Sequence, residues 1–74
     1  MSIQGNKRVM LDYVAAKEFA RAFAGYYGYT VNNEVKIING TLDKQASYTI
    51  VTPDAGELEE FINLVREGEV RRTW

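Results

Sequence analysis

The strongest constraint on the fold is a change of hydrophobic period at Gly28. Before this glycine, apolar side chains recur every three or four residues, at Tyr13, Ala16, Phe19, Ala20, Phe23 and Tyr27. That spacing places them on one stripe of an α-helix. After the glycine, apolar and polar residues alternate, which is typical of a half-buried strand. One short chain therefore combines both kinds of element, and the sequence predicts an α+β fold.

The first helix is predicted over residues 12–28. Asp12 precedes the apolar stripe, and its carboxylate can accept from the free backbone N–H groups of the first turn. Gly28 can adopt the left-handed conformation that closes a helix. Tyr27 on the stripe and Tyr29 at the start of the strand pattern are expected in the core. Tyr26 projects from the side of the stripe and is left for a partner.

Two or three antiparallel strands are predicted after the first helix. The alternation over residues 29–39 contains Asn32-Asn33, which either lies inside one long strand or forms a tight turn. The turn is preferred, because asparagine is disfavoured inside strands and tolerates left-handed backbone. It would give three strands in all. Without this turn, we expect the edge strands of two copies to pair, because an isolated two-stranded sheet is only marginally stable.

The remaining sheet is predicted from residues on either side of this segment. Asn39-Gly40 is expected to begin a loop that continues to Gln45, and a strand is expected over residues 46–52. A short strand over residues 8–11, before the first helix, would enlarge the sheet.

A second helix is predicted after Pro53, which cannot donate to a strand ladder. Asp54 and Glu57 form a pattern like a capping box, and Gly68 is expected to end the helix. The predicted order is helix, two- or three-stranded antiparallel sheet, helix, with both helices on one face of the sheet. Residues 1–74 form a single domain, with flexible residues 1–6 and a short C-terminal tail over residues 69–74.

Composition argues against most catalytic chemistry. The chain has no histidine and no cysteine, so it lacks thiolate nucleophiles, Cys-His or Ser-His pairs and ordinary transition-metal sites. Neither of the glycine-rich phosphate loops, GxGxxG or GxxxxGK[ST], occurs. Glu57, Glu59 and Glu60 are neighbours on an exposed helix, without the burial that separates the pKa values of a catalytic pair. The sequence predicts no enzyme, no cofactor and no metal.

A cytoplasmic location is expected. The longest uncharged run, residues 22–33, is shorter than the roughly 20 mainly apolar residues that a membrane span needs. The first residues lack the hydrophobic stretch of a secretory signal. We therefore expect no membrane partner.

The second helix has a charge that suggests a protein partner. Residues 54–70 contain six acidic residues against Arg66, a net charge of minus five, which is more than complementation of the helix dipole requires. Trp74 either joins an interface or folds back over the small core. The candidate partner-binding residues are Tyr26, Glu57, Glu59, Glu60, Asn63, Glu67, Arg71, Arg72 and Trp74.

We expect a small non-enzymatic protein-binding module, an inhibitor or adaptor. The order of its elements resembles, at the level of the fold, some phage-encoded inhibitors such as anti-CRISPR proteins. One alternative is a nucleic-acid-binding domain that uses Lys17, Arg21, Lys36 and the tyrosines, although the net charge of −1 does not favour it. A second alternative is a structural subunit that assembles with itself, as a homodimer or a larger species.

Overall fold

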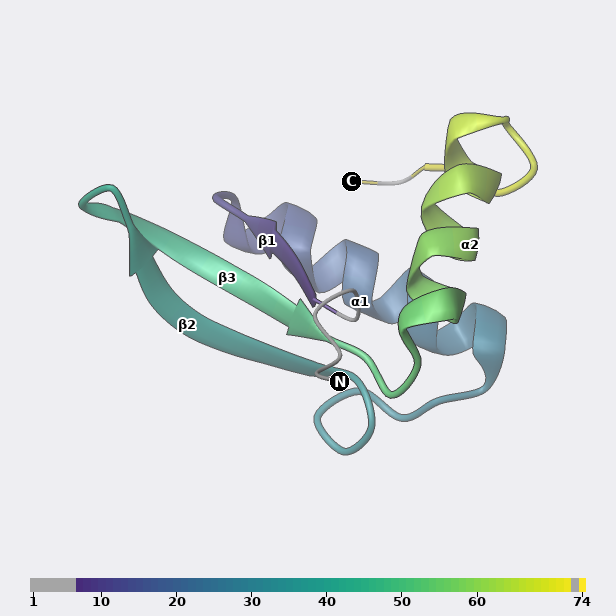
Figure 1. Ribbon diagram of the computed structural model, residues 1–74, viewed down its shortest axis with the longest axis horizontal. Helices are drawn as coiled ribbons and strands as arrows, with labels where there is room; N and C mark the ends of the chain where they lie inside the picture. The colour runs from purple at the N-terminus through teal and green to yellow at the C-terminus, as the bar shows by residue number, and fades with distance from the viewer. Residues whose placement is uncertain (1–6, 73) are drawn as a thin grey trace.

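The computed structural model describes residues 7–72 and 74. The chain runs through β1 (Lys7–Met10), α1 (Tyr13–Tyr27), β2 (Lys36–Leu42), β3 (Gln45–Val51) and α2 (Ala55–Arg66) (Figure 1). The predicted α+β class is confirmed. The expectation of flexible residues 1–6 lies outside the described residues.

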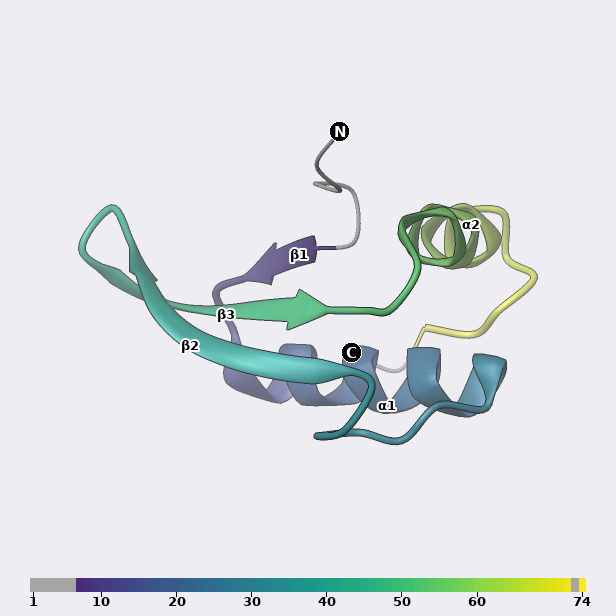
Figure 2. The same cartoon turned by 60° about the horizontal axis from the view of Figure 1, so that its bottom comes forward.

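The three strands form one antiparallel sheet in the order β1-β3-β2. Figure 2 shows α1 along one face of this sheet, and α1 contacts all three strands. In both views α2 lies beyond the end of β3, and its Phe61 packs against Phe19 and Phe23 of α1. The prediction that both helices lie on one face of the sheet is therefore not confirmed, because α2 packs on α1 at the end of the sheet.

The ends of α1 are those that the sequence predicts. The Asp12 carboxylate accepts from the backbone N–H groups of Val14, at 2.9 Å, and Ala15, at 3.4 Å. Gly28 has a left-handed φ of 78°, and its N–H donates to the Ala24 carbonyl. Both ends thus satisfy backbone groups that the helix itself leaves unpaired.

The start of α2 also follows the prediction. The Asp54 carboxylate accepts from the backbone N–H of Glu57 at 3.1 Å. The helix ends at Arg66, and Gly68, with a φ of 86°, donates to the Val65 carbonyl at 3.1 Å. The glycine therefore closes the helix two residues after its last α-helical position.

The third strand is β1, whereas residues 29–31 form a loop. The Thr30 carbonyl accepts from the backbone N–H groups of both Glu34 and Val35. Asn32 has a φ of 80°, so the predicted turn at Asn32-Asn33 exists. It joins Val31 to Val35 by an isolated bridge and makes no hairpin of two strands. The short strand predicted before α1 is present as β1, and it is the third strand of the sheet.

The predicted loop from Asn39 to Gln45 is wrong. β2 continues through Asn39, which is paired with Tyr48, to Leu42. The turn consists of Asp43 and Lys44 alone, with φ values of 52° and 66°. Positive φ at both central residues is the conformation that best matches the twist of a two-residue hairpin.

The core lies where α1, α2 and β3 meet. The rings of Phe19, Phe23 and Phe61 pack edge to face, with Phe61 5.6 Å from Phe19 and 5.5 Å from Phe23 between centroids. Trp74 folds back onto this cluster, 5.3 Å from Phe19. Of the two alternatives for this tryptophan, the structure shows the one in which it covers the core. The buried apolar residues are Ala16, Phe19, Ala20, Phe23, Ala24, Val35, Ile50, Leu58 and Phe61.

Candidate binding surfaces

Tyr26 is an exposed aromatic side chain with a fixed position. It lies in the last turn of α1 with 53% of its surface exposed. Its ring is 4.9 Å from that of Tyr27 and 5.8 Å from that of Phe61. A ring held by two aromatic neighbours loses little conformational freedom when a partner covers it.

The neighbouring Tyr27 and Tyr29, which the sequence predicts in the core, are partly buried and pack against it. Tyr27 packs on Phe23 at 4.8 Å, and burial, followed by the charge of Glu60, raises the pKa of its phenol. Its hydroxyl oxygen is buried and has no hydrogen-bond partner among residues 7–72 and 74. The Tyr29 hydroxyl donates to Glu57 Oε1 at 2.5 Å, and this bond is the main reason that the Tyr29 pKa rises to about 12.

The acidic side chains of α2 divide between two sides of the helix. Glu57 and Glu60 lie near enough to Tyr27 to raise its pKa. Glu67 caps the C-terminal end of α2 with helical backbone angles, and its spacing of seven residues from Glu60 places it on the same side. Together with Tyr26 these three residues form what we call the acidic surface. Glu59 and Asn63 are exposed farther around the helix.

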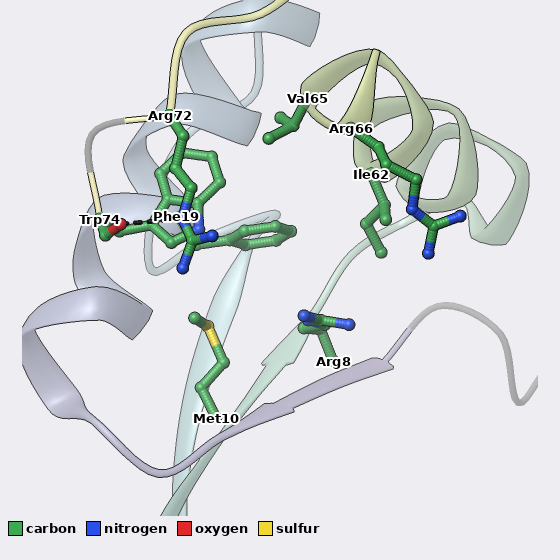
Figure 3. Close-up of a pocket in the computed structure, with 8 residues that line it drawn as sticks. All are labelled: Arg8, Met10, Phe19, Ile62, Val65, Arg66, Arg72 and Trp74. Atoms are coloured by element: carbon green, nitrogen blue, oxygen red, sulfur yellow. Dashed lines mark hydrogen bonds between the residues drawn. The ribbon is translucent and has the colours of Figure 1, made fainter. Parts of the chain in front are cut away.

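A second candidate site is a pocket beside Trp74, with a volume of about 240 Å³. Figure 3 shows side chains reaching it from β1, α1, α2 and the C-terminal segment. Arg72 Nε donates at 2.9 Å to an oxygen of the terminal carboxylate of Trp74. We call this pocket the arginine pocket, after Arg8, Arg66 and Arg72. Its lining consists of Arg8, Met10, Phe19, Ile62, Val65, Arg66, Arg72 and Trp74.

The arginine pocket separates residues that the sequence grouped together. Arg72 and Trp74 lie in it, on the side of α2 that carries Ile62 and Arg66, whereas Glu57 and Glu60 lie on the side toward the tyrosines. Arg71 is exposed and is not part of the lining. Sequence reasoning missed Arg8 and Arg66, because only the fold brings the first strand beside the second helix.

The third candidate is the sheet face opposite α1. Cross-strand register places Val9 and Ile38 on either side of Thr49, and Lys7 and Lys36 on either side of Val51. Val9 and Ile38 remain 50% and 51% exposed. Leu42, two positions beyond Gly40 on the same face, is also 50% exposed. We call Val9, Ile38 and Leu42 the open sheet face. This face is not evident from the sequence, because Leu42 lies in the predicted loop and β1 pairs with a strand distant in the chain.

The structure does not gather the cations of the nucleic-acid alternative. Lys17 Nζ lies 5.3 Å from the ring centroid of Tyr13, and Arg21 is exposed one turn later on α1. Lys36 lies beside Val51 on the sheet face opposite α1. Phosphate binding along one strand needs a continuous positive groove, and these three side chains do not form one.

Comparisons with protein-family models, curated proteins and solved structures found no match to this chain. Within residues 7–72 and 74, no group of three acidic side chains is close enough to hold a metal ion. In the same part of the chain, neither helix has the length and apolar character needed to cross a membrane.

Proposed function

We propose that this chain is a non-enzymatic protein-binding module, an inhibitor or adaptor that covers a basic surface of its partner. The observation that supports the proposal is the exposed Tyr26 ring, packed on Phe61 and Tyr27. Glu57 and Glu60 lie near the same Tyr27. Binding energy at protein interfaces is concentrated in such aromatic anchors, surrounded by a polar rim.

The size of the anchor is sufficient for a binding hot spot. A tyrosine side chain buries roughly 150 to 250 Å² when covered, and 53% of Tyr26 is still exposed. Covering roughly 100 Å² at about 25 cal/mol per Å² contributes about 2.5 kcal/mol. Loss of this contact would weaken a complex by nearly two orders of magnitude.

The glutamates contribute selectivity and association rate. Exposed carboxylates each add little to affinity, and salt screens them. Several of one sign on one surface speed encounter with a positively charged partner and disfavour an acidic one. Affinity for the partner should therefore fall as the salt concentration rises.

The test is retention of host proteins on the immobilised chain, compared across variants. Tyr26→Ser removes the anchor, and Glu60→Lys reverses one charge of the acidic surface. Glu18→Lys on α1 makes the same change in net charge away from that surface. A protein retained by the wild type and Glu18→Lys, and lost from the other two variants, supports the proposal. Equal retention on all four contradicts it.

A second candidate function is self-assembly through the open sheet face. We propose that two copies pack these faces together, because Val9, Ile38 and Leu42 offer three half-exposed aliphatic side chains on one side of the sheet. In an antiparallel arrangement, the lysine end of one face meets the Leu42 end of the other, which keeps like charges apart.

Light scattering after size exclusion decides this second candidate. The wild type should elute as a dimer, and Ile38→Lys should elute as a monomer. Val14→Lys, at a position 65% exposed on α1, is the control and should remain dimeric. A monomeric wild type at about 100 μM, a concentration that would populate even a micromolar dimer, would exclude self-assembly.

A further inference from the structure

We propose that the arginine pocket binds a compact organic anion: a phosphate monoester carried on an apolar body. The pocket is separate from the acidic surface and from the open sheet face, so this inference does not depend on either. It is supported by the composition of the lining, the charge of the lining and the size of the space.

The lining combines two kinds of side chain. Three guanidinium groups come from three different elements: Arg8 from β1, Arg66 from α2 and Arg72 from the C-terminal segment (Figure 3). The other side chains are apolar: Met10, Phe19, Ile62, Val65 and Trp74. A ligand that satisfies both kinds needs an anionic group and an apolar body in one small molecule.

The charge of the lining favours a dianion. Among the described residues that line the pocket, three have arginine side chains and none has an acidic side chain. The terminal carboxylate of Trp74, which Arg72 binds, offsets one of these three charges and leaves a net positive lining. Arginine presents a planar fork of donors that binds phosphate and carboxylate in pairs of hydrogen bonds. Arg72 uses its Nε for the terminal carboxylate of Trp74, which leaves its terminal N–H groups for a ligand. A phosphate monoester, with a charge near minus two at neutral pH, offsets more of this charge than a carboxylate does.

The size of the pocket limits the apolar body. A volume of about 240 Å³ is somewhat below the range of roughly 300 to 1,000 Å³ that is usual for small-molecule sites. One aromatic ring or a short alkyl chain fits beside the anionic group. A dinucleotide does not.

Trp74 supplies a direct signal for the test, since it is the chain's single tryptophan and it lines the pocket. We would titrate the protein with phenyl phosphate and follow Trp74 fluorescence. Inorganic phosphate tests the anion alone, benzoate tests a monoanion on the same ring, and benzyl alcohol tests the ring alone. We expect saturation with phenyl phosphate, and binding of each other compound at least tenfold weaker. Added salt should weaken phenyl phosphate binding.

Two variants and a matched control locate the site. Arg8→Gln and Arg66→Gln should each raise the dissociation constant about tenfold, because each removes a charged hydrogen-bond donor. Arg71→Gln removes an equal charge next to the pocket without changing its lining, and should leave binding within about threefold. The proposal is overturned by a wild-type signal that does not saturate at about 10 mM phenyl phosphate. Equal weakening in Arg71→Gln and the two pocket variants would also overturn it.

Discussion

Replacing Phe61 with alanine removes the ring on which both helices and the C-terminal segment meet. Phe61 is fully buried, and its neighbours belong to α1 and to the end of the chain. Five aromatic rings lie with centroids 5.5 to 6.2 Å from its own: Phe19, Phe23, Tyr26, Tyr27 and Trp74.

The expected loss is large relative to the stability of so small a domain. A buried Phe→Ala change costs about 3 to 5 kcal/mol, whereas a chain of 74 residues has about 4 to 11 kcal/mol in total. With a urea slope of about 1 kcal/mol per M, the unfolding midpoint of Phe61→Ala should fall by about 3 M or more. Circular dichroism measures the midpoint, and a variant already unfolded without urea agrees with the expectation.

The control is Val14→Ala, at a position 65% exposed on α1. Its free energy of unfolding should stay within about 0.5 kcal/mol of the wild type. A loss below about 1 kcal/mol in Phe61→Ala would refute the reasoning, because α2 would then not be held on α1 through this ring.

Three further predictions concern helix ends and one tyrosine. Asp12→Ala should lower the free energy of unfolding by about 1 kcal/mol in urea titration, since it removes the N-terminal cap of α1. Gly28→Ala should lower the melting temperature, because φ is 78° there and costs an alanine about 1 to 2 kcal/mol, whereas Gly25→Ala in open space within α1 should raise it; changes of the same sign would contradict this. The Tyr29 pKa is about 12 against an ordinary 10.0, so the stability from its bond to Glu57 is fully present below pH 10 and is lost as pH rises toward 12. Absorbance titration should show the ionisation of Tyr29 near pH 12, and Glu57→Gln should lower the Tyr29 pKa; an unchanged titration would rule out the bond.

The helices were predictable from sequence because their signals are local. Asp12 and Asp54 cap the helices that they precede, and Gly28 and Gly68 adopt the left-handed backbone that the sequence assigns to them. Each signal acts within a few residues of the end that it marks.

The sheet was harder to predict because its decisive contacts are distant in sequence. Asn39-Gly40 is a strong local turn signal, yet both residues pair with β3 and the chain turns at Asp43-Lys44. Lysine in left-handed backbone has no sequence signature. β1 is only four residues long, and its partner, β3, is separated from it by a helix and a further strand.

The candidate sites follow the same rule: features set by neighbouring residues were predictable, and those set by distant contacts were not. Helical periodicity separates the exposed Tyr26 from Tyr27, which packs against the core, because that distinction is made within one turn. The arginine pocket could not be predicted, since Arg8 and Arg66 belong to elements at opposite ends of the chain. Nothing in either local segment indicates that the other lies nearby.

The measurement that tests the proposed function most directly is an NMR footprint of the retained partner on the isotope-labelled chain. We expect the largest shifts and line broadening on Tyr26, Glu60 and Glu67, and we expect them to weaken as salt is added. Val9, Ile38 and Leu42 on the open sheet face should change little. A footprint confined to the open sheet face, with the signals of the acidic surface unmoved, would contradict the account.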